Sequence, residues 1–256
     1  MLPGNAAALY NLGTAHAYGE GVTQDWVEAV RYYRLAAAQG LAAAQAALGV
    51  CFARGDGVAQ DSAEAVRYFR LAAAQGHADA QHNLGFCFSR GEGVAQDWAE
   101  AARYYRLAAE QGLASAQYNL GVCFSRGDGV AQDWTKAARY FRLAAEQGHA
   151  GAQTSLGGCF ERGDGVARDS AETLRYYRLA ATQADKLSPA LLAVTLAAFE
   201  RIACDRELAA ACCLGCGARR KLKKCSKCHV AKFCGNECVA RAWPAHKPNC
   251  KLWRDG

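Results

Sequence analysis

A pattern that repeats every 36 residues constrains the fold of this chain more than any other feature of its sequence. The string Gly-Glu/Asp-Gly-Val occurs five times at this spacing, beginning at Gly19, Gly55, Gly91, Gly127 and Gly163. A Leu-Gly pair and the string Arg-Tyr-Tyr/Phe-Arg-Leu-Ala-Ala recur with the same period, so five copies fill residues 6–185 without an insertion. A period of this length indicates an array in which each small structural unit packs on the next.

Each copy is predicted to form a hairpin of two helices. In the second copy, one apolar face has the helical spacing i, i+4, i+7, i+8 and consists of Ala44, Leu48, Cys51 and Phe52. The glycine-rich stretch 55–57 then ends that helix. A second helix follows, with an apolar face made of Ala65, Tyr68, Phe69, Ala72 and Ala73. One hairpin cannot bury both faces alone, so we expect neighbouring copies to stack.

The ends of the second helix carry their own signals. Asp61 occupies the N-cap position and Glu64 follows three residues later, which is the pattern of a capping box. The pair recurs as Asp25/Glu28, Asp97/Glu100 and Asp169/Glu172, whereas Lys136 follows Asp133 in the fourth copy. Gly76 ends the helix, and we expect a left-handed conformation there and at Gly40, Gly112 and Gly148.

Three strings in each copy carry a resemblance to a known family: Ala-Gln-x-x-Leu-Gly, Gly-x-Gly-Val-x-Gln-Asp and Tyr-Tyr-Arg-Leu-Ala-Ala. They resemble the Sel-1-like repeats, which are relatives of the tetratricopeptide repeats. The resemblance implies an all-α fold, a right-handed α-solenoid of five helix hairpins, and a scaffold or adaptor role without chemistry of its own. The concave surface of such a solenoid is the expected place for an extended partner.

Four cysteines recur once per copy, at Cys51, Cys87, Cys123 and Cys159. We interpret them as small buried core residues, because free cysteine is often buried. Stacked helices lie about 8–10 Å apart, whereas a disulfide needs Cα atoms within about 7 Å. A metal or redox chain along the array is the alternative interpretation.

Other polar residues of the array have structural interpretations as well. His77 and His149 are in phase with leucines in other copies, so we interpret them as turn residues rather than ligands. The repeated arginines, such as Arg67 and Arg70, either face a partner or form a solvated helix face paired with nearby acids.

The repeat pattern decays after residue 182, and Ser188-Pro189 is a typical helix start. We predict a helix over roughly residues 188–211 that covers the last repeat, with a rigid spacer as the alternative. The expected domains are therefore the repeat array at 1–185, this capping or connecting helix at 186–211, and a C-terminal module at 212–256.

The C-terminal module has the ligand pattern of a double zinc site. Eight thiol or imidazole side chains occur in four closely spaced pairs: Cys213/Cys216, Cys225/Cys228, Cys234/Cys238 and His246/Cys250. Eight such ligands suit two tetrahedral zinc ions with no position left for water or substrate, so both ions are expected to be structural. A cluster of disulfides is the alternative, and it requires an oxidising compartment.

This pattern resembles the MYND-type zinc finger. The resemblance implies interleaved ligation, with Cys213, Cys216, Cys234 and Cys238 on one ion and Cys225, Cys228, His246 and Cys250 on the other. It also implies binding of a short proline-containing peptide, for which Trp243 and Phe233 are the candidate contacts. Packing of these two aromatic side chains in the small core of the finger is the alternative.

Charge is concentrated in the same module, since residues 213–256 carry 11 basic and 2 acidic side chains. The run Arg219–Lys224 between two ligand pairs indicates either a solvated zinc loop or a nucleic-acid or nuclear-targeting patch. Aromatic residues do not interrupt the run, which argues against recognition of single strands by base stacking.

The beginning of the chain lacks the basic and apolar regions of a signal peptide. The longest apolar run, near residues 190–199, is far shorter than the ~20 residues that span a bilayer. We therefore expect a protein of the cytosol, the nucleus or both, without a membrane partner.

The sequence predicts a non-enzymatic adaptor that holds one protein partner on the solenoid and a short peptide of another on the zinc finger. We find no nucleophile–base pairing or phosphate loop, and no stretch is left to supply a catalytic domain or a small-molecule site. Two alternatives remain. One is a nucleic-acid-associated regulatory protein that uses the basic tail, and the other is a non-catalytic subunit of a ubiquitin-ligase or methyltransferase assembly.

Overall fold

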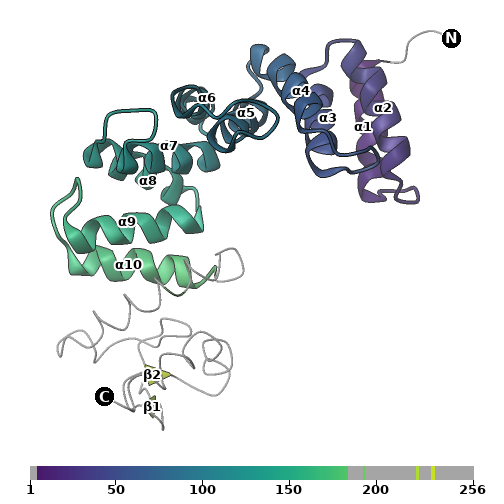
Figure 1. The fold of residues 1–256 in the computed structure, drawn as a ribbon. Coiled ribbons are helices and arrows are strands. Elements are labelled where there is room, and N and C mark those ends of the chain that lie inside the picture. The colour runs from purple at the N-terminus through teal and green to yellow at the C-terminus, as the bar shows by residue number, and fades with distance from the viewer. Residues whose placement is uncertain (1–4, 184–192, 194–222, 225–231, 234–256) are drawn as a thin grey trace, which may run out of the picture. The chain divides into compact units, whose positions relative to one another are not determined.

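The computed structural model describes residues 5–183, residue 193, residues 223–224 and residues 232–233. Residues 5–183 form ten helices of 12 or 13 residues each (Figure 1). Their bounds are α1 Ala6–Tyr18, α2 Trp26–Ala38, α3 Ala42–Arg54, α4 Ser62–Ala74, α5 Ala78–Arg90, α6 Trp98–Glu110, α7 Ala114–Arg126, α8 Trp134–Glu146, α9 Ala150–Arg162 and α10 Ser170–Ala181. Two short strands, β1 Lys223–Lys224 and β2 Lys232–Phe233, pair in antiparallel fashion with Lys223 opposite Phe233.

The helices form two compact units, Met1–Asp133 with α1–α7 and Trp134–Gly256 with α8–α10. Within a unit, the two helices of one repeat pack on each other, as α1 does on α2 and α9 on α10. The second helix of a repeat also packs on the first helix of the next, as α2 does on α3 and α8 on α9. The predicted stack of helix hairpins is confirmed.

Half of the predicted capping box is present. Asp61 Oδ1 accepts hydrogen bonds from the backbone N–H groups of Ala63 at 2.9 Å and Glu64 at 3.0 Å. The Glu64 carboxylate, however, pairs with Arg67 at 2.8 Å instead of reaching back to the cap. The N–H of Asp61 donates to the carbonyl of Phe52 at 2.9 Å, so the last turn of α3 already supplies its acceptor. The glutamate half of the prediction is therefore wrong in this copy.

Gly76 has a positive φ of 84°, as expected, and the equivalent residues Gly40, Gly112 and Gly148 behave alike. His77 and His149 follow such glycines and cap the next helix. His77 Nδ1 accepts the N–H of Ala80 at 3.4 Å, and His149 Nδ1 accepts that of Ala152 at 3.1 Å. The two histidines are thus N-caps of α5 and α9, in addition to lying in the turns where they were predicted.

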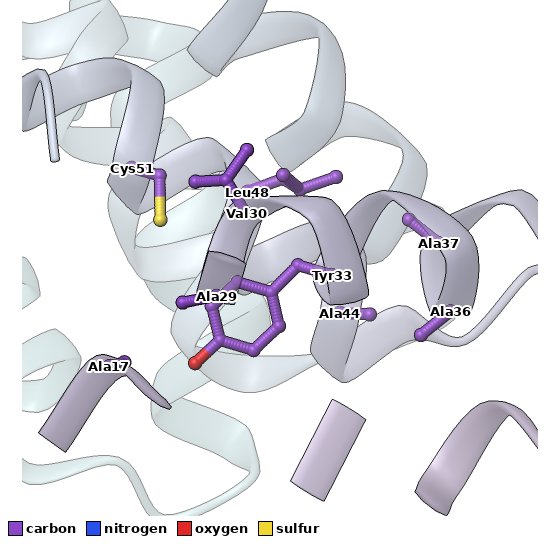
Figure 2. Close-up of a cluster of buried hydrophobic side chains, with 9 residues drawn as sticks. All are labelled: Ala17, Ala29, Val30, Tyr33, Ala36, Ala37, Ala44, Leu48 and Cys51. Carbon is purple, nitrogen blue, oxygen red and sulfur yellow. The ribbon is translucent and has the colours of Figure 1, made fainter. Parts of the chain in front are cut away.

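The Leu-Gly pair of each first helix has two separate structural roles. Leu48, Leu84, Leu120 and Leu156 are completely buried. The glycine that follows makes room for an aromatic ring of the second helix, because a Cβ on Gly13 would lie 2.7 Å from the ring of Tyr33. Figure 2 shows Tyr33 within the resulting cluster around Leu48 and Cys51.

Glutamines join consecutive repeats through a buried polar ladder. Gln81 Nε2 donates to the carbonyl of Ala73 in the preceding repeat at 3.4 Å, and its Oε1 accepts from Gln111 at 2.7 Å. Gln45, Gln117 and Gln153 donate to the preceding repeat in the same way. The ladder satisfies helix-end carbonyls inside the interface, where an unpaired polar group is costly.

Replacing Leu84 by alanine is expected to destabilise the chain by about 2–5 kcal/mol, because it removes a completely buried side chain and leaves a cavity. The free energy of unfolding from urea titrations monitored by circular dichroism tests this. Leu71→Ala is the matched control, since Leu71 is 43% exposed, and it should cost less than about 1 kcal/mol. Equal losses for the two variants would contradict the assignment of Leu84 to the core.

Candidate functional site

Among the first helices of the internal repeats, most of the variable positions fall on one face. The helices α3, α5 and α7 have 13 residues each and differ at only five positions. Four of these positions form what we call the variable stripe: Ala43/Asp79/Ser115, Ala46/His82/Tyr118, Ala47/Asn83/Asn119 and Val50/Phe86/Val122. Their spacing is i, i+3, i+4 and i+7, which places them on one side of a helix. The fifth position points inward, as Ser89 is buried and lies 3.4 Å from the Tyr105 hydroxyl.

Burial explains why the other positions are the same. The alanine, leucine and cysteine equivalent to Ala44, Leu48 and Cys51 are buried in each internal repeat. Most of the variable stripe is half-buried or exposed, and Phe86 is 39% exposed, whereas Ala46 is buried. Packing within the array therefore does not dictate the side chains of the stripe.

Contacts within the stripe run from one repeat to the next. Asn119 Nδ2 lies 3.0 Å from His82 Nε2, so side chains of α7 and α5 meet directly. The imidazole also lies near the ring of Tyr105, with the ring centroids 5.8 Å apart. Burial lowers the pKa of His82, so this imidazole is neutral at pH 7. The guanidinium of Arg90 lies 5.1 Å from the ring centroid of Phe86 at the edge of the stripe.

The stripe has the chemistry of a polypeptide-binding surface. Its carboxamides can each donate and accept, which matches the N–H and C=O of a peptide group. Its aromatic rings offer flat apolar area of the kind that dominates protein interfaces. Sequence reasoning missed this surface, although the five copies, when compared with one another, already contain the signal.

The four repeated cysteines belong to the core, as predicted. All are free and buried, and burial raises the pKa of each thiol to about 11. The thiols are therefore protonated at neutral pH, and the thiolate that attacks electrophiles or binds metal is scarce. Among the described residues, His, Cys, Asp and Glu form no group of three that could hold a metal ion.

Arg67 and Arg70 lie on α4, the second helix of its repeat, whereas the variable stripe lies on first helices. Arg67 pairs with Glu64 and lies 4.3 Å from the ring centroid of Tyr68, which confirms the predicted pairing with nearby acids. Arg70 instead lies over the ring of Phe88 in the next repeat, 5.8 Å from its centroid. These side chains contribute contacts within and between repeats.

The predicted zinc finger contributes little to the described geometry. The eight predicted ligands, Cys213, Cys216, Cys225, Cys228, Cys234, Cys238, His246 and Cys250, and also Trp243 lie outside the described residues. Phe233 belongs to β2, opposite Lys223 of β1. The two paired strands thus flank in sequence the stretch that contains Cys225 and Cys228.

Comparisons with known proteins agree with both parts of the chain. The Sel1 repeat family matches residues 6–41, 42–77, 78–113, 114–149 and 150–185. The MYND finger family matches residues 213–250, and this match implies zinc binding.

Curated relatives are similar to the finger alone. A human protein, "Histone-lysine N-methyltransferase SMYD3", is 46% identical over 50 residues, which are 20% of this chain and 10% of that protein. "Histone-lysine N-methyltransferase ASHR1" of Arabidopsis thaliana is 44% identical over 39 residues, which are 15% of this chain and 8% of that protein. The chain therefore spans about a tenth of the length of these relatives.

Solved structures are similar to the repeats. A Sel1 repeat protein from Oxalobacter formigenes has a TM-score of 0.65 and 34% identity, covering 70% of this chain and 73% of that one. A protective antigen of uropathogenic Escherichia coli with an SLR fold has a TM-score of 0.77 and 30% identity, covering 97% of this chain and 48% of that one. In the part of the chain that the structure describes, no helix combines the length and the apolar character needed to cross a membrane.

Proposed function

The chain belongs to the Sel1 repeat family, and from that premise we propose that it is a non-enzymatic adaptor holding one protein on its repeats and another on its C-terminal finger. Repeats and a MYND finger together indicate a protein-interaction adaptor. The variable stripe carries the proposal for the repeats, because it is a surface of rings and carboxamides that packing does not explain. The functional parts would be residues 1–185, a connecting helix at 186–211 and the finger at 212–256.

The partner on the repeats would be an extended polypeptide segment. His82 and Asn119 already meet across two repeats, so the stripe offers a continuous row rather than separate patches. Carboxamides such as Asn83 would bind the peptide backbone, while Phe86 and Tyr118 would contact apolar side chains. Such recognition needs no charge on the partner, since Asp79 is the one acidic residue among the stripe residues.

The finger would hold two structural zinc ions. Its donor set, seven thiols and one imidazole, suits zinc and fills two tetrahedral shells completely. Cys213, Cys216, Cys234 and Cys238 would hold one ion, and Cys225, Cys228, His246 and Cys250 the other. Trp243, with Phe233 beside it, would contact a proline-containing peptide.

Selection of peptides from a displayed random library on the full zinc-loaded chain tests the two-partner proposal. For one class of selected peptides, the double variant Phe86→Ala/Tyr118→Ala is expected to weaken binding roughly 30-fold, because both rings supply contact area. Trp243→Ala should weaken binding of a different class and leave the first unchanged. Leu71→Ala, on the exposed side of α4, is the matched control and should affect neither class. A single class weakened by both the Phe86/Tyr118 and the Trp243 substitutions would contradict the assignment of two sites.

A further inference from the structure

The second helices α2, α4 and α6 each expose two arginines, three residues apart, whose electrostatic surroundings differ. The first arginine forms an ion pair with the glutamate three residues before it, as Arg67 does with Glu64 at 2.8 Å. The second arginine has no carboxylate within ion-pair distance in residues 5–183. We call these second arginines the arginine row: Arg34, Arg70 and Arg106.

Aromatic rings of the following repeat hold members of the arginine row in place. The guanidinium of Arg34 lies 6.0 Å from the ring centroid of Phe52, and that of Arg70 lies 5.8 Å from the ring centroid of Phe88. Each of these rings stacks in turn on a tyrosine of its own repeat, with centroid distances of 5.6 and 5.7 Å. A guanidinium that stacks on a ring uses its flat face, so the N–H groups at its edge can still donate to a carboxylate.

The neighbouring elements of the array do not cover the row. Arg70 lies on α4, which packs on α3 before it and on α5 after it, and it is exposed although both of these neighbours are present. Residues 184–256 carry 14 basic and 6 acidic side chains, so as a whole they have the same sign of charge as the row and are repelled by it. Charge complementarity therefore favours an occupant from outside the chain.

The charge around the row indicates which kind of anion fits. Residues 5–133 carry 13 acidic and 9 basic side chains, so this part of the array is acidic as a whole although the row is not neutralised. A nucleic acid has a dense array of phosphates, which the surrounding carboxylates would repel. A polypeptide with a few separated carboxylates avoids this repulsion, and each carboxylate can accept two hydrogen bonds from one guanidinium.

We propose that the arginine row binds an acidic segment of a partner protein, with one carboxylate on Arg34 and another on Arg70. Packed helices lie about 8–10 Å apart, so equivalent positions of consecutive repeats are on the order of 10–20 Å apart. An extended chain covers about 3.3 Å per residue, which puts the two carboxylates roughly three to six residues apart. Arg106 contributes less, because Glu110 follows it by one helical turn, where α2 and α4 have alanine. The row lies on second helices, so this partner is additional to the one proposed for the variable stripe.

Photo-cross-linking of synthetic peptides to the full zinc-loaded chain tests the proposal. The probes are Gly/Ser peptides of about twelve residues, long enough to span both arginines, that carry one benzophenone group and two glutamates. The glutamates are three, four, five or six residues apart, and matched peptides have glutamine instead. At least one glutamate peptide is expected to cross-link to residues 26–90 at a roughly 10-fold lower concentration than its glutamine version, because the latter cannot form the two ion pairs.

Substitutions of arginine show where the peptide binds. Arg34→Gln/Arg70→Gln is expected to raise the concentration of glutamate peptide that half-saturates this cross-linking about 10-fold. Arg54→Gln/Arg126→Gln is the matched control and should leave this concentration unchanged, because it removes the same charge from exposed arginines at the ends of α3 and α7. Circular dichroism confirms that both variants keep their helices. Locating the cross-links by mass spectrometry separates the row from the basic finger, which also attracts acidic peptides.

Four results would overturn the proposal. Cross-links confined to residues 213–256 would show that the finger alone holds the peptide, and equal effects of the two double variants would show that overall charge explains the binding. Double-stranded DNA carrying the same benzophenone group should not cross-link to residues 26–90. Cross-linking of this DNA in preference to the glutamate peptides would make a nucleic acid the occupant. Sedimentation showing a dimer that Arg34→Gln/Arg70→Gln dissociates would make a second copy of the chain the occupant.

Discussion

Removing zinc from the full chain with a chelator is expected to unfold residues 213–250 and to leave helices α1–α10 folded. The finger is too short to form a sizeable core, so its fold depends on metal ligation. Structural zinc sites contribute on the order of 10–16 kcal/mol, which is more than a small domain gains from packing. The helices have their own core around residues such as Leu84 and are expected to stay folded without metal. Metal analysis before chelation should give two zinc ions per chain, and circular dichroism with limited proteolysis should locate the loss in the finger.

Substitution of single cysteines separates ligands from bystanders. Cys228→Ser should unfold the finger even in excess zinc, since it removes a thiolate from a saturated shell. Cys212→Ser is the matched control, because Cys212 is adjacent to the ligand Cys213 but outside the proposed set. It should retain both ions. A loss of zinc in Cys212→Ser, a ratio near one ion per chain, or melting of the helices together with the finger would each contradict the ligand assignment or the independence of the two parts.

The parts of the fold that depend on neighbours in sequence were predictable. Apolar spacing placed Leu48 and Cys51 in the core, and the N-cap at Asp61 and the left-handed Gly76 followed from residue type. The hydrogen-bond partner of Glu64 was not predictable in this way. The carbonyl of Phe52 in the preceding helix accepts the backbone N–H that the glutamate was expected to bind. Such competition between a local and a tertiary partner does not appear in the local sequence pattern.

Of the candidate sites, the zinc finger was predictable from the sequence, whereas the variable stripe was not predicted. The ligand pattern of the finger is a local signal, whereas the variable stripe needs knowledge of which positions packing holds constant. Asn119 and His82 are 37 residues apart, and only stacking brings them to 3.0 Å. The stripe could have been found by comparing the copies, since the substitutions from Ala46 to His82 and Tyr118 occur between a glutamine and a Leu-Gly pair that are the same in all three helices.

Replacing Gly57 by alanine is expected to destabilise the array by about 2–5 kcal/mol. Its φ of 70° is left-handed, which costs an L-residue about 1–2 kcal/mol. In addition, the new Cβ would overlap the backbone of Trp26 in the preceding repeat, and forced overpacking costs about 1–3 kcal/mol. Backbone cannot rotate away as a side chain can, so the two repeats would have to separate. Urea titrations followed by circular dichroism, at concentrations where the chain is monomeric, give the free energy of unfolding.

Gly21→Ala is the matched control, because it introduces the same Cβ at nearly the same φ, 74°, in open space. It should cost only the conformational part, about 1–2 kcal/mol. The difference between the two variants then measures how tightly one repeat is pressed on the next, independently of left-handed strain. If Gly57→Ala lowered the free energy of unfolding no more than Gly21→Ala does, the two repeats would not be tightly packed at this contact. The second glycine of the Gly-x-Gly-Val string would then be a turn residue alone, rather than the point where each repeat is held against its neighbour.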